Sequence, residues 1–187
     1  MPDLASLLKG NRKAQHEFYE THKVAMFKLC RMYIKNKHTA EDVLQEGFVK
    51  IFRSIDSYDS SKGKIETWMR AIFTNTCLMQ IRSEKQVAET VELSKVISNL
   101  KTSFPEKKLS TLSLNEIFTL LHELPHGYRM VFVLYFVEGL NHKEISDLLN
   151  ISQNTSKSQL FKSKKKMQEL IVKKFPNQYT KYAKTAQ

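Results

Sequence analysis

Apolar residues recur at every third or fourth position along most of the chain, which is the spacing of one face of an α-helix. The chain contains only five glycines and four prolines, and the long segments between them show helical rather than alternating periodicity. The sequence therefore predicts an all-α fold.

The helical pattern forms two clusters. The first extends from about residue 15 to residue 82 and comprises three or four helices with a polar loop at 57–64. The second extends from about residue 113 to residue 175, with breaks at ELPHGY and EGLN. The charged segment between them has weak periodicity and contains Pro105, as is typical of a linker. We predict small helical domains at 1–83 and 111–175, a linker at 84–110 and a tail at 176–187.

The second cluster contains a candidate helix-turn-helix. The segment NHKEISDLLN predicts a short amphipathic helix, and Asn150 follows it where many helices end in a left-handed residue. Asparagine tolerates that conformation better than most residues other than glycine. Ser152 is then placed to cap the next helix. Two helices joined by such a short turn are typical of this DNA-binding motif.

The helix that follows, within ISQNTSKSQLFKSKKKMQ, has two unlike sides. The side expected to pack carries Ser156, Leu160, Ser163, Met167, and Leu170 or Ile171. The opposite side carries Asn154, Thr155, Ser158, Lys162 and Lys165, flanked by Phe161 and Lys166. Hydrogen-bonding groups near the helix start, followed by cations, suit DNA base edges and then phosphates.

Charge favours a polyanionic partner over a merely solvated lysine-rich face. Residues 151–168 include five lysines and no acid, and we expect Lys162 and Lys166 to form an unrelieved like-charge i,i+4 pair. Residues 141–187 carry a net charge of +7, most of the excess in a chain of net charge +11. Such a balance, with a pI near 9.6, predicts binding to nucleic acid or to an anionic membrane, and composition does not choose between them.

The segment HTAEDVLQEGFVKIFRSID predicts a helix with an acidic side. Thr39 is the expected N-cap, with Asp42 three residues later as in a capping box. The apolar stripe comprises Leu44, Phe48, Ile51, Phe52 and Ile55, and the exposed side comprises Asp42, Gln45, Glu46 and Val49. Acids favour helix N-termini, which explains Asp42 better than Glu46. An acidic patch on a basic protein is a candidate docking surface for a basic partner.

Aromatic and basic residues alternate after this helix. Tyr58, Lys62 and Lys64 lie in the loop SYDSSKGK, and Trp68, Arg70, Asn75 and Arg82 lie in the helix that follows. Aromatic rings interleaved with cations suit stacking on unpaired bases. Core packing is the alternative for Trp68, because it lies near the apolar stripe Ile65–Ile72–Met79. We expect Phe73 and the loop to be exposed.

The sequence offers no chemistry typical of an enzyme. Cys30 and Cys77 lie far apart and lack metal-ligand spacing, which predicts reduced thiols. Pro125 separates His122 from His126, so we predict no metal site and no cofactor. There is no nucleophile with a base and no Gly-rich phosphate loop. The absence of long apolar runs and of a signal-peptide pattern predicts a cytoplasmic protein without membrane insertion.

These motifs resemble a known family. AEDVLQEGFVKIF is similar to region 2.2 of sigma-70-type RNA polymerase sigma factors, and IETWMRAIFTNTCLMQIR to regions 2.3 and 2.4. LPHGYRMVFVLYFVEGLNHKEISDLLNISQNTSKSQLFKSKKKMQEL resembles region 4. Two such modules joined by a linker, covering about residues 15–82 and 113–171, resemble the extracytoplasmic-function (ECF) subfamily. The resemblance implies a non-catalytic factor that binds core RNA polymerase and directs promoter-specific initiation.

The resemblance also implies residue roles and partners. Asp42, Gln45 and Glu46 would bind the clamp helices of the polymerase β′ subunit. The −10 element would be bound by Tyr58, Lys62, Lys64, Trp68, Arg70, Asn75 and Arg82, with the loop and Asn75 capturing a flipped base. The −35 element would be bound by Asn154, Thr155, Lys157, Ser158, Phe161, Lys162 and Lys165. The β flap, promoter DNA in the nucleoid and an anti-sigma factor are the other partners that the family implies.

Some positions depart from the family's pattern. Asn150 and Asn154 stand where Gly is common, Ser156 where Val is frequent, and Gln159 where Arg is frequent. Lysines replace several arginines further on, and Lys lacks the bidentate fork that Arg offers to a guanine. The competing hypothesis is a helix-turn-helix regulator that acts without polymerase, usually as a symmetric dimer on a palindrome.

Overall fold

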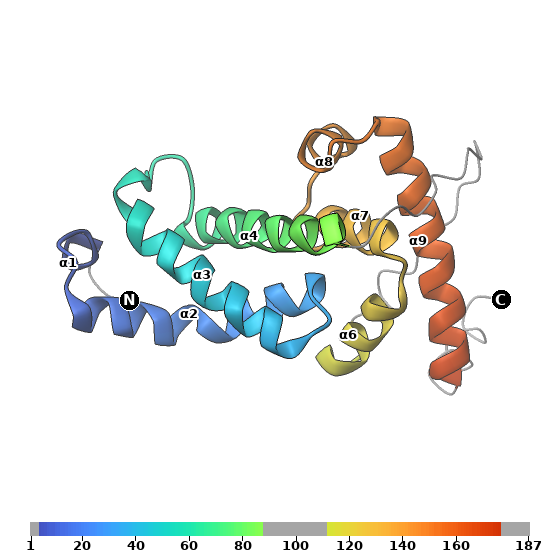
Figure 1. Cartoon of the computed structure of the whole chain (residues 1–187), viewed down its shortest axis with the longest axis horizontal. Coiled ribbons are helices and arrows are strands. Elements are labelled where there is room, and N and C mark those ends of the chain that lie inside the picture. The colour runs from blue at the N-terminus through green and yellow to red at the C-terminus, as the bar shows by residue number, and fades with distance from the viewer. Residues whose placement is uncertain (1–3, 88–111, 177–187) are drawn as a thin grey trace. The chain divides into compact units, whose positions relative to one another are not determined.

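The computed structural model describes residues 4–87 and 112–176 of the chain. Its contacts divide the protein into two compact units, Met1–Val91 and Glu92–Gln187. Within the described residues every regular element is a helix and no strand occurs (Figure 1). The predicted all-α fold is therefore confirmed.

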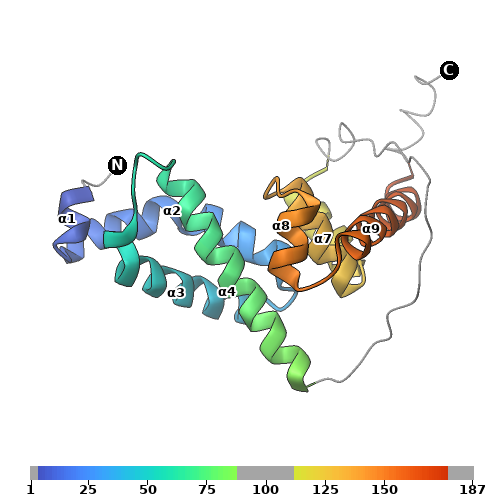
Figure 2. The ribbon, with the colours of Figure 1, turned by 90° about the horizontal axis from the view of Figure 1, so that it is seen from above.

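The first unit is a helical bundle. Its elements are α1 (Leu4–Leu8), α2 (Arg12–Tyr33), α3 (Lys37–Ser54), the 3₁₀ turn η1 (Ile55–Ser57) and α4 (Ile65–Val87). Helices α2, α3 and α4 pack against one another, as Figure 2 shows from above. Helix α4 continues to Val87, past residue 84, where the linker was predicted to begin.

The N-terminal end is more helical than predicted, because the prediction began only at about residue 15. The side chain of Asn11 caps α2 by accepting hydrogen bonds from the backbone N–H groups of Lys13 and Ala14, at 2.9 and 3.1 Å. Gly10, at φ +68°, provides the left-handed residue between α1 and α2. Leu7 of α1 is buried, so this short helix closes one end of the bundle.

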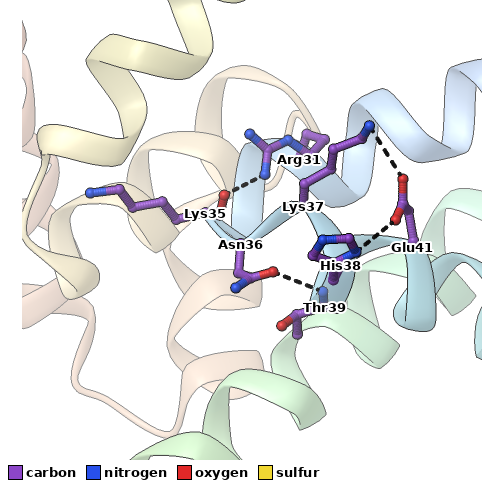
Figure 3. A network of polar contacts seen from close by, with 7 residues as sticks. All are labelled: Arg31, Lys35, Asn36, Lys37, His38, Thr39 and Glu41. Atoms are coloured by element: carbon purple, nitrogen blue, oxygen red, sulfur yellow. Dashed lines mark hydrogen bonds and ion pairs between the residues drawn. The ribbon is translucent and has the colours of Figure 1, made fainter.

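A polar network holds the turn between α2 and α3 (Figure 3). The guanidinium of Arg31 donates to the carbonyl oxygen of Lys35, and Lys37 and His38 lie 3.7 and 3.4 Å from the carboxylate of Glu41. The Asn36 side chain accepts from the N–H of Thr39 at 3.2 Å and is the N-cap. The prediction that Thr39 caps this helix was therefore wrong, because Asn36 begins it earlier.

The core of the first unit is built on the side of α4 that carries Met69, Phe73 and Cys77, all 0% exposed. Two expectations were therefore wrong: Phe73 is buried rather than exposed, and Met79, assigned to the packed stripe, is 58% exposed. The Phe73 ring packs edge-on to Phe48 of α3, with ring centroids 5.3 Å apart. Cys30 is also buried with a free thiol, as is Cys77.

The second unit contains four helices within the described residues. They are α6 (Leu114–Glu123), α7 (His126–Phe136), α8 (His142–Leu149) and α9 (Gln153–Lys174). Helix α7 contributes a continuous buried run, Met130–Leu134, and packs against α9. Capping boxes begin α6 at Ser113 and α8 at Asn141. Helix α6 ends at Glu123, so His122 and His126 lie on different helices, as the intervening proline predicted.

Candidate nucleic-acid interface and acidic face

Helices α8 and α9 form the predicted helix-turn-helix with a turn of three residues. Asn150 adopts the left-handed conformation, with φ 54° and ψ 51°. The hydroxyl of Ser152 then accepts a hydrogen bond from the N–H of Thr155 at 2.9 Å and caps α9. Because both predicted turn residues have the predicted roles, the direction in which α9 leaves α8 is set locally by the sequence.

The two sides of α9 are divided as the periodicity predicts. The side that packs is buried along its whole length, at Ser156, Leu160, Ser163, Met167, Leu170 and Ile171. On the opposite side Asn154, Lys157 and Lys165 are exposed, and Thr155, Ser158, Phe161 and Lys162 are partly exposed. The structure thus places all seven residues predicted for the −35 element on accessible positions of one helix.

Some of these polar groups are already engaged within α9. The hydroxyls of Thr155 and Ser152 lie 2.8 Å apart, and the Ser158 hydroxyl donates to the carbonyl of Thr155 at 3.0 Å. Base contacts by Thr155 or Ser158 would compete with these local hydrogen bonds. Asn154 and Lys157 have no such contact within the described residues and are the freer groups at the start of the helix.

The lysines of α9 differ in how far their charge is balanced. Lys166 lies 3.3 Å from the carboxylate of Glu169, so the expectation that its repulsion with Lys162 is unrelieved was wrong. The Lys164 ammonium lies over the rings of Tyr135 and Phe136, 5.8 and 5.1 Å from their centroids. In contrast, Lys157, Lys162 and Lys165 form no ion pair within the part of the chain that the structure describes.

The acidic side of α3 is exposed as predicted. Asp42, Gln45 and Glu46 are all exposed, and Val49 beside them is 46% exposed. The Glu46 carboxylate, however, forms an ion pair with Lys50 at 2.6 Å. Glu46 therefore has a local structural role that the sequence analysis did not give it, whereas Asp42 forms no ion pair within the described residues.

The loop before α4 is closed by its own hydrogen bonds. The Tyr58 hydroxyl donates to the carbonyl of Gly63 at 3.0 Å. Asp59 accepts from the hydroxyl and N–H of Ser61, at 2.7 and 2.9 Å, and these donors hold the pKa of Asp59 below its ordinary value. Lys62 lies 3.6 Å from Asp59 and remains exposed, as does Lys64. The loop thus presents two cations on a preformed turn.

Tyr58 also links the loop to α4 and borders a small cavity. Its ring lies 5.6 Å from the ring of Trp68, which is half-buried against it. Trp68 therefore contacts the loop, so neither full exposure nor burial in the core describes it. A cavity of about 200 Å³ is lined by Tyr58 together with Leu4, Leu7, Phe18, His22, Ser60 and Ile65.

Further along α4, the predicted −10 residues do not all have the same exposure. Asn75 and Arg82 are exposed and share a side of the helix, whereas Arg70 is half-buried. Met79 lies between Asn75 and Arg82 on that side, and sequence reasoning missed it because it was counted as core. Its exposure was not evident from a helix with apolar residues on several sides.

Two classes of site have no support in the described residues. No group of three or more His, Cys, Asp or Glu side chains there is arranged to hold a metal ion. Likewise, none of the helices in 4–87 and 112–176 combines the length and apolar character needed to cross a bilayer.

Comparison with known proteins identifies both halves of the chain. The family model for Sigma-70 region 2 matches residues 18–87, and that for Sigma-70, region 4 matches residues 114–167. The ECF RNA polymerase sigma factor SigM of Bacillus subtilis is 30% identical over 155 residues, covering 82% of this chain and 93% of SigM. SigW, an ECF RNA polymerase sigma factor of the same organism, is 31% identical over 174 residues, covering 87% of this chain and 91% of SigW.

Two solved structures share the fold. CnrH in complex with the cytosolic domain of CnrY is 19% identical with a TM-score of 0.51, covering 91% of this chain and 96% of that chain. The sigma factor RpoE in complex with the anti-sigma factor NepR from Bartonella quintana is 17% identical with a TM-score of 0.51, covering 83% and 95%. Because both regions match in order and two relatives are at least 30% identical over most of their length, the chain belongs to the ECF family of sigma-70-type RNA polymerase sigma factors.

Proposed function

We propose that this chain, an alternative sigma factor that directs transcription initiation, binds polymerase and the two promoter elements through three separate surfaces. The acidic side of α3 binds polymerase, α9 binds the −35 element, and the loop with α4 binds the −10 element. We place region 2 at residues 1–87 rather than 1–83, because α4 continues to Val87, and region 4 at residues 111–175, with a linker between them and a tail at 176–187.

The acidic side of α3 binds the clamp helices of β′. Asp42, Gln45 and Glu46 lie on the exposed side of a helix whose other side is buried. On a chain of net charge +11, a local negative patch is complementary to a basic protein surface and excludes DNA from that side. Region 4 adds a second attachment, to the β flap.

Helix α9 enters the major groove at −35. Asn154, Lys157 and Ser158 lie in its first turns, where base edges are contacted in a helix-turn-helix. Phe161 is half-buried in the next turn and offers an apolar contact. Lys162 and Lys165 supply phosphate contacts, because neither has an acidic partner in the described part of the chain.

The loop and α4 capture the −10 element after opening. Lys62 and Lys64 contact the backbone, and Tyr58 with Trp68 provides aromatic surface for an unpaired base. Asn75 and Arg82 continue this surface along α4, whereas Arg70 is half-buried and lies about 140° around the helix from Asn75, on another side. Unstacking a base step costs a few kcal/mol, so one capture pocket shifts the equilibrium between closed and open promoter appreciably.

Regulation and location follow from the same partners. The solved CnrH and RpoE structures contain CnrY and the anti-sigma factor NepR, respectively. We infer that an anti-sigma factor binds this chain too, and that it acts in the cytoplasm, where polymerase meets the nucleoid. The chain itself makes or breaks no covalent bond and needs no cofactor or metal.

The observation that best supports the proposal is that one chain carries both an acidic side on α3 and a helix-turn-helix in which Lys157, Lys162 and Lys165 form no ion pair within the described residues. The test is co-purification of the full-length chain with core polymerase, followed by mapping of transcription starts in vitro. We expect a complex and starts at a common −35/−10 pattern. Asp42→Ala combined with Glu46→Ala should weaken the complex at least about tenfold, because both charges leave the docking face.

The competing hypothesis predicts a different result. A polymerase-independent regulator would bind duplex DNA by itself, as a symmetric dimer on a palindrome, and would not associate with core polymerase. Palindrome binding without polymerase association would overturn the proposal. Unchanged association of the Asp42→Ala/Glu46→Ala variant would overturn the assignment of α3 alone.

A further inference from the structure

A partly buried polar contact joins the two helices of the helix-turn-helix. His142 is the first residue of α8, and its Nδ1 lies 2.9 Å from the hydroxyl oxygen of Ser156 on α9. Ser156 is 0% exposed. A hydroxyl removed from water in this way needs a hydrogen-bond partner, and its absence would be costly.

The His142 ring also contacts a second helix. Tyr135 of α7 stacks on it, with ring centroids 5.2 Å apart and an angle of 28° between the planes. The ammonium of Lys164, about two turns beyond Ser156 on α9, lies over the same tyrosine ring. His142 therefore contacts α7 and α9 from α8, and the three helices meet at one side chain.

Ser156 lies among the residues that we expect to contact bases, so a change at this contact would also move those residues. Asn154, Lys157 and Ser158 surround Ser156 in the first turns of α9 and project from the accessible sides of the helix. A rotation or shift of these turns would move all three side chains together relative to a base edge. Hydrogen bonds to bases tolerate little such displacement, whereas phosphate contacts of long lysines tolerate more.

We propose that His142 is a positioning residue for −35 recognition, which fixes the rotational setting of the first turns of α9 through the buried hydroxyl of Ser156. The inference rests on the proposed role of α9 at −35. Burial, and the nearby charges of Lys157 and Lys164, lower the pKa of His142, so its neutral form is favoured. In that form Nδ1 is able to accept a hydrogen bond from the Ser156 hydroxyl.

The test measures selectivity separately from charge-driven affinity. Holoenzyme assembled from the full-length chain first selects its preferred −35 sequence from a random library. Two quantities are then measured for each protein variant. The first is the ratio of affinities for that sequence and for its single-base variants, and the second is the slope of log affinity against log salt concentration. His142→Leu should reduce the ratio about tenfold, because the Ser156 hydroxyl loses its partner. The salt slope should stay unchanged, because Lys162 and Lys165 are untouched.

Two further variants distinguish positioning from loss of fold. His142→Asn keeps a hydrogen-bonding atom near the position of Nδ1 and should retain most of the selectivity. Ser156→Val should lose selectivity alone but regain it when combined with His142→Leu, because an apolar contact then replaces the polar one. His16→Leu, the same exchange at an exposed histidine of the other unit, is the matched control. Melting temperatures are recorded for every variant.

The possible outcomes separate this inference from the proposed function. Equal selectivity in wild type, His142→Leu and Ser156→Val would overturn the positioning role. A parallel loss of selectivity, salt-dependent affinity and melting temperature in His142→Leu, Ser156→Val and the double variant would also overturn it, since that is the result of a merely structural contact. If wild-type holoenzyme selects no −35 sequence, the function proposed for α9 itself fails.

Discussion

Glu46 and Lys50 lie one turn apart on α3 and form an ion pair with 2.6 Å between Oε1 and Nζ. The same ammonium donates to the hydroxyl of Thr76 on α4 at 3.3 Å, so it is held in place by a second helix. Part of the negative charge of Glu46 is therefore balanced before any partner arrives. Asp42, one turn earlier on the same exposed side, has no such ion pair within the described residues.

This asymmetry predicts unequal contributions to polymerase binding. Asp42→Asn should weaken association with core polymerase about tenfold, whereas Glu46→Gln should weaken it only about two- to threefold, because Lys50 already offsets part of the Glu46 charge. Each exchange removes one charge with little change in shape, so the two variants control for each other. The measurement is the Kd for core polymerase; an equal or larger effect of Glu46→Gln would contradict this reasoning.

The lysines of α9 should likewise contribute unequally to DNA binding. Lys162→Ala should weaken promoter binding and reduce the salt slope by about one charge, as expected when a phosphate contact is lost. Lys166→Ala should reduce the slope by less, because Glu169 already balances part of its charge. The slopes come from binding titrations at several salt concentrations. An unchanged slope for Lys162→Ala would place that lysine off the DNA.

Gly47 on α3 is expected to be intolerant of any side chain. A Cβ built at Gly47 would lie 2.2 Å from the ring of Phe73, which is itself fully buried and cannot withdraw. Gly47→Ala should destabilise the first unit by about 1–3 kcal/mol, the usual cost of overpacking. Urea unfolding measures this change, and Phe73→Leu in the same chain should relieve part of the loss.

Gly127 on α7 is a matched control for that substitution. A Cβ there would approach only the flexible end of Gln159, at 3.1 Å. Gly127→Ala should therefore cost little, and the gain in helix propensity of about 1 kcal/mol should offset much of the contact. Equal destabilisation by the two variants would show that backbone effects, and not Phe73, explain Gly47.

Asn150 tests the turn between α8 and α9. Its φ of 54° is unfavourable for a residue with an ordinary side chain. Asn150→Ala should destabilise the second unit by about 1 kcal/mol, whereas Asn150→Gly should leave it unchanged or more stable. Thermal unfolding of the two variants beside wild type measures the difference. A stable Asn150→Ala protein would mean that the turn adopts another conformation.

Stability should fall on mild acidification because of His22. Burial lowers the pKa of His22 below its ordinary value of 6.5, with a smaller opposing effect of the Glu66 charge. The unfolded chain therefore binds this proton more readily than the folded protein does. The stabilising contribution is fully present above pH 6.5 and is lost as the pH falls from 6.5 through the folded pKa.

Urea unfolding at several pH values between 7.5 and 5 tests this direction. His22→Leu, which removes the buried proton acceptor, should flatten the decline in the first unit, and His16→Leu at an exposed position should not. The pKa of His142 is shifted in the same direction, so the second unit should respond likewise. A wild-type stability that rises on acidification across this range would contradict the assignment.

Prediction from sequence succeeded where one helix and its immediate neighbours contain all the information. The two sides of α9 follow from its apolar spacing, because Leu160 and Met167 define one side without ambiguity. The turn into α9 follows from the conformational tolerance of Asn150 and the capping hydroxyl of Ser152. The local ion pairs of Lys166 with Glu169 and of Lys50 with Glu46 were also within reach, because residues three and four apart are neighbours on any helix.

The buried side of α4 could not be deduced in that way. This helix carries apolar residues over much of its circumference, so Ile65, Ile72 and Met79 form as good a stripe as Met69, Phe73 and Cys77. The choice depends on α3, where Gly47 leaves the space that the Phe73 ring fills. The space belongs to a residue 26 positions away in the sequence, and no periodicity within α4 reports it.

The sequence by itself therefore determined that this chain is helical, that it carries two sigma-type regions in order, and which side of α9 is cationic. Only the tertiary structure decided which side of α4 is buried, and that His142 meets Ser156 across the helix-turn-helix. The physical reason is that helix formation and the sides of a helix depend on residues within a few positions of one another. The complementarity between helices depends on the shapes of side chains that come together only when the chain folds.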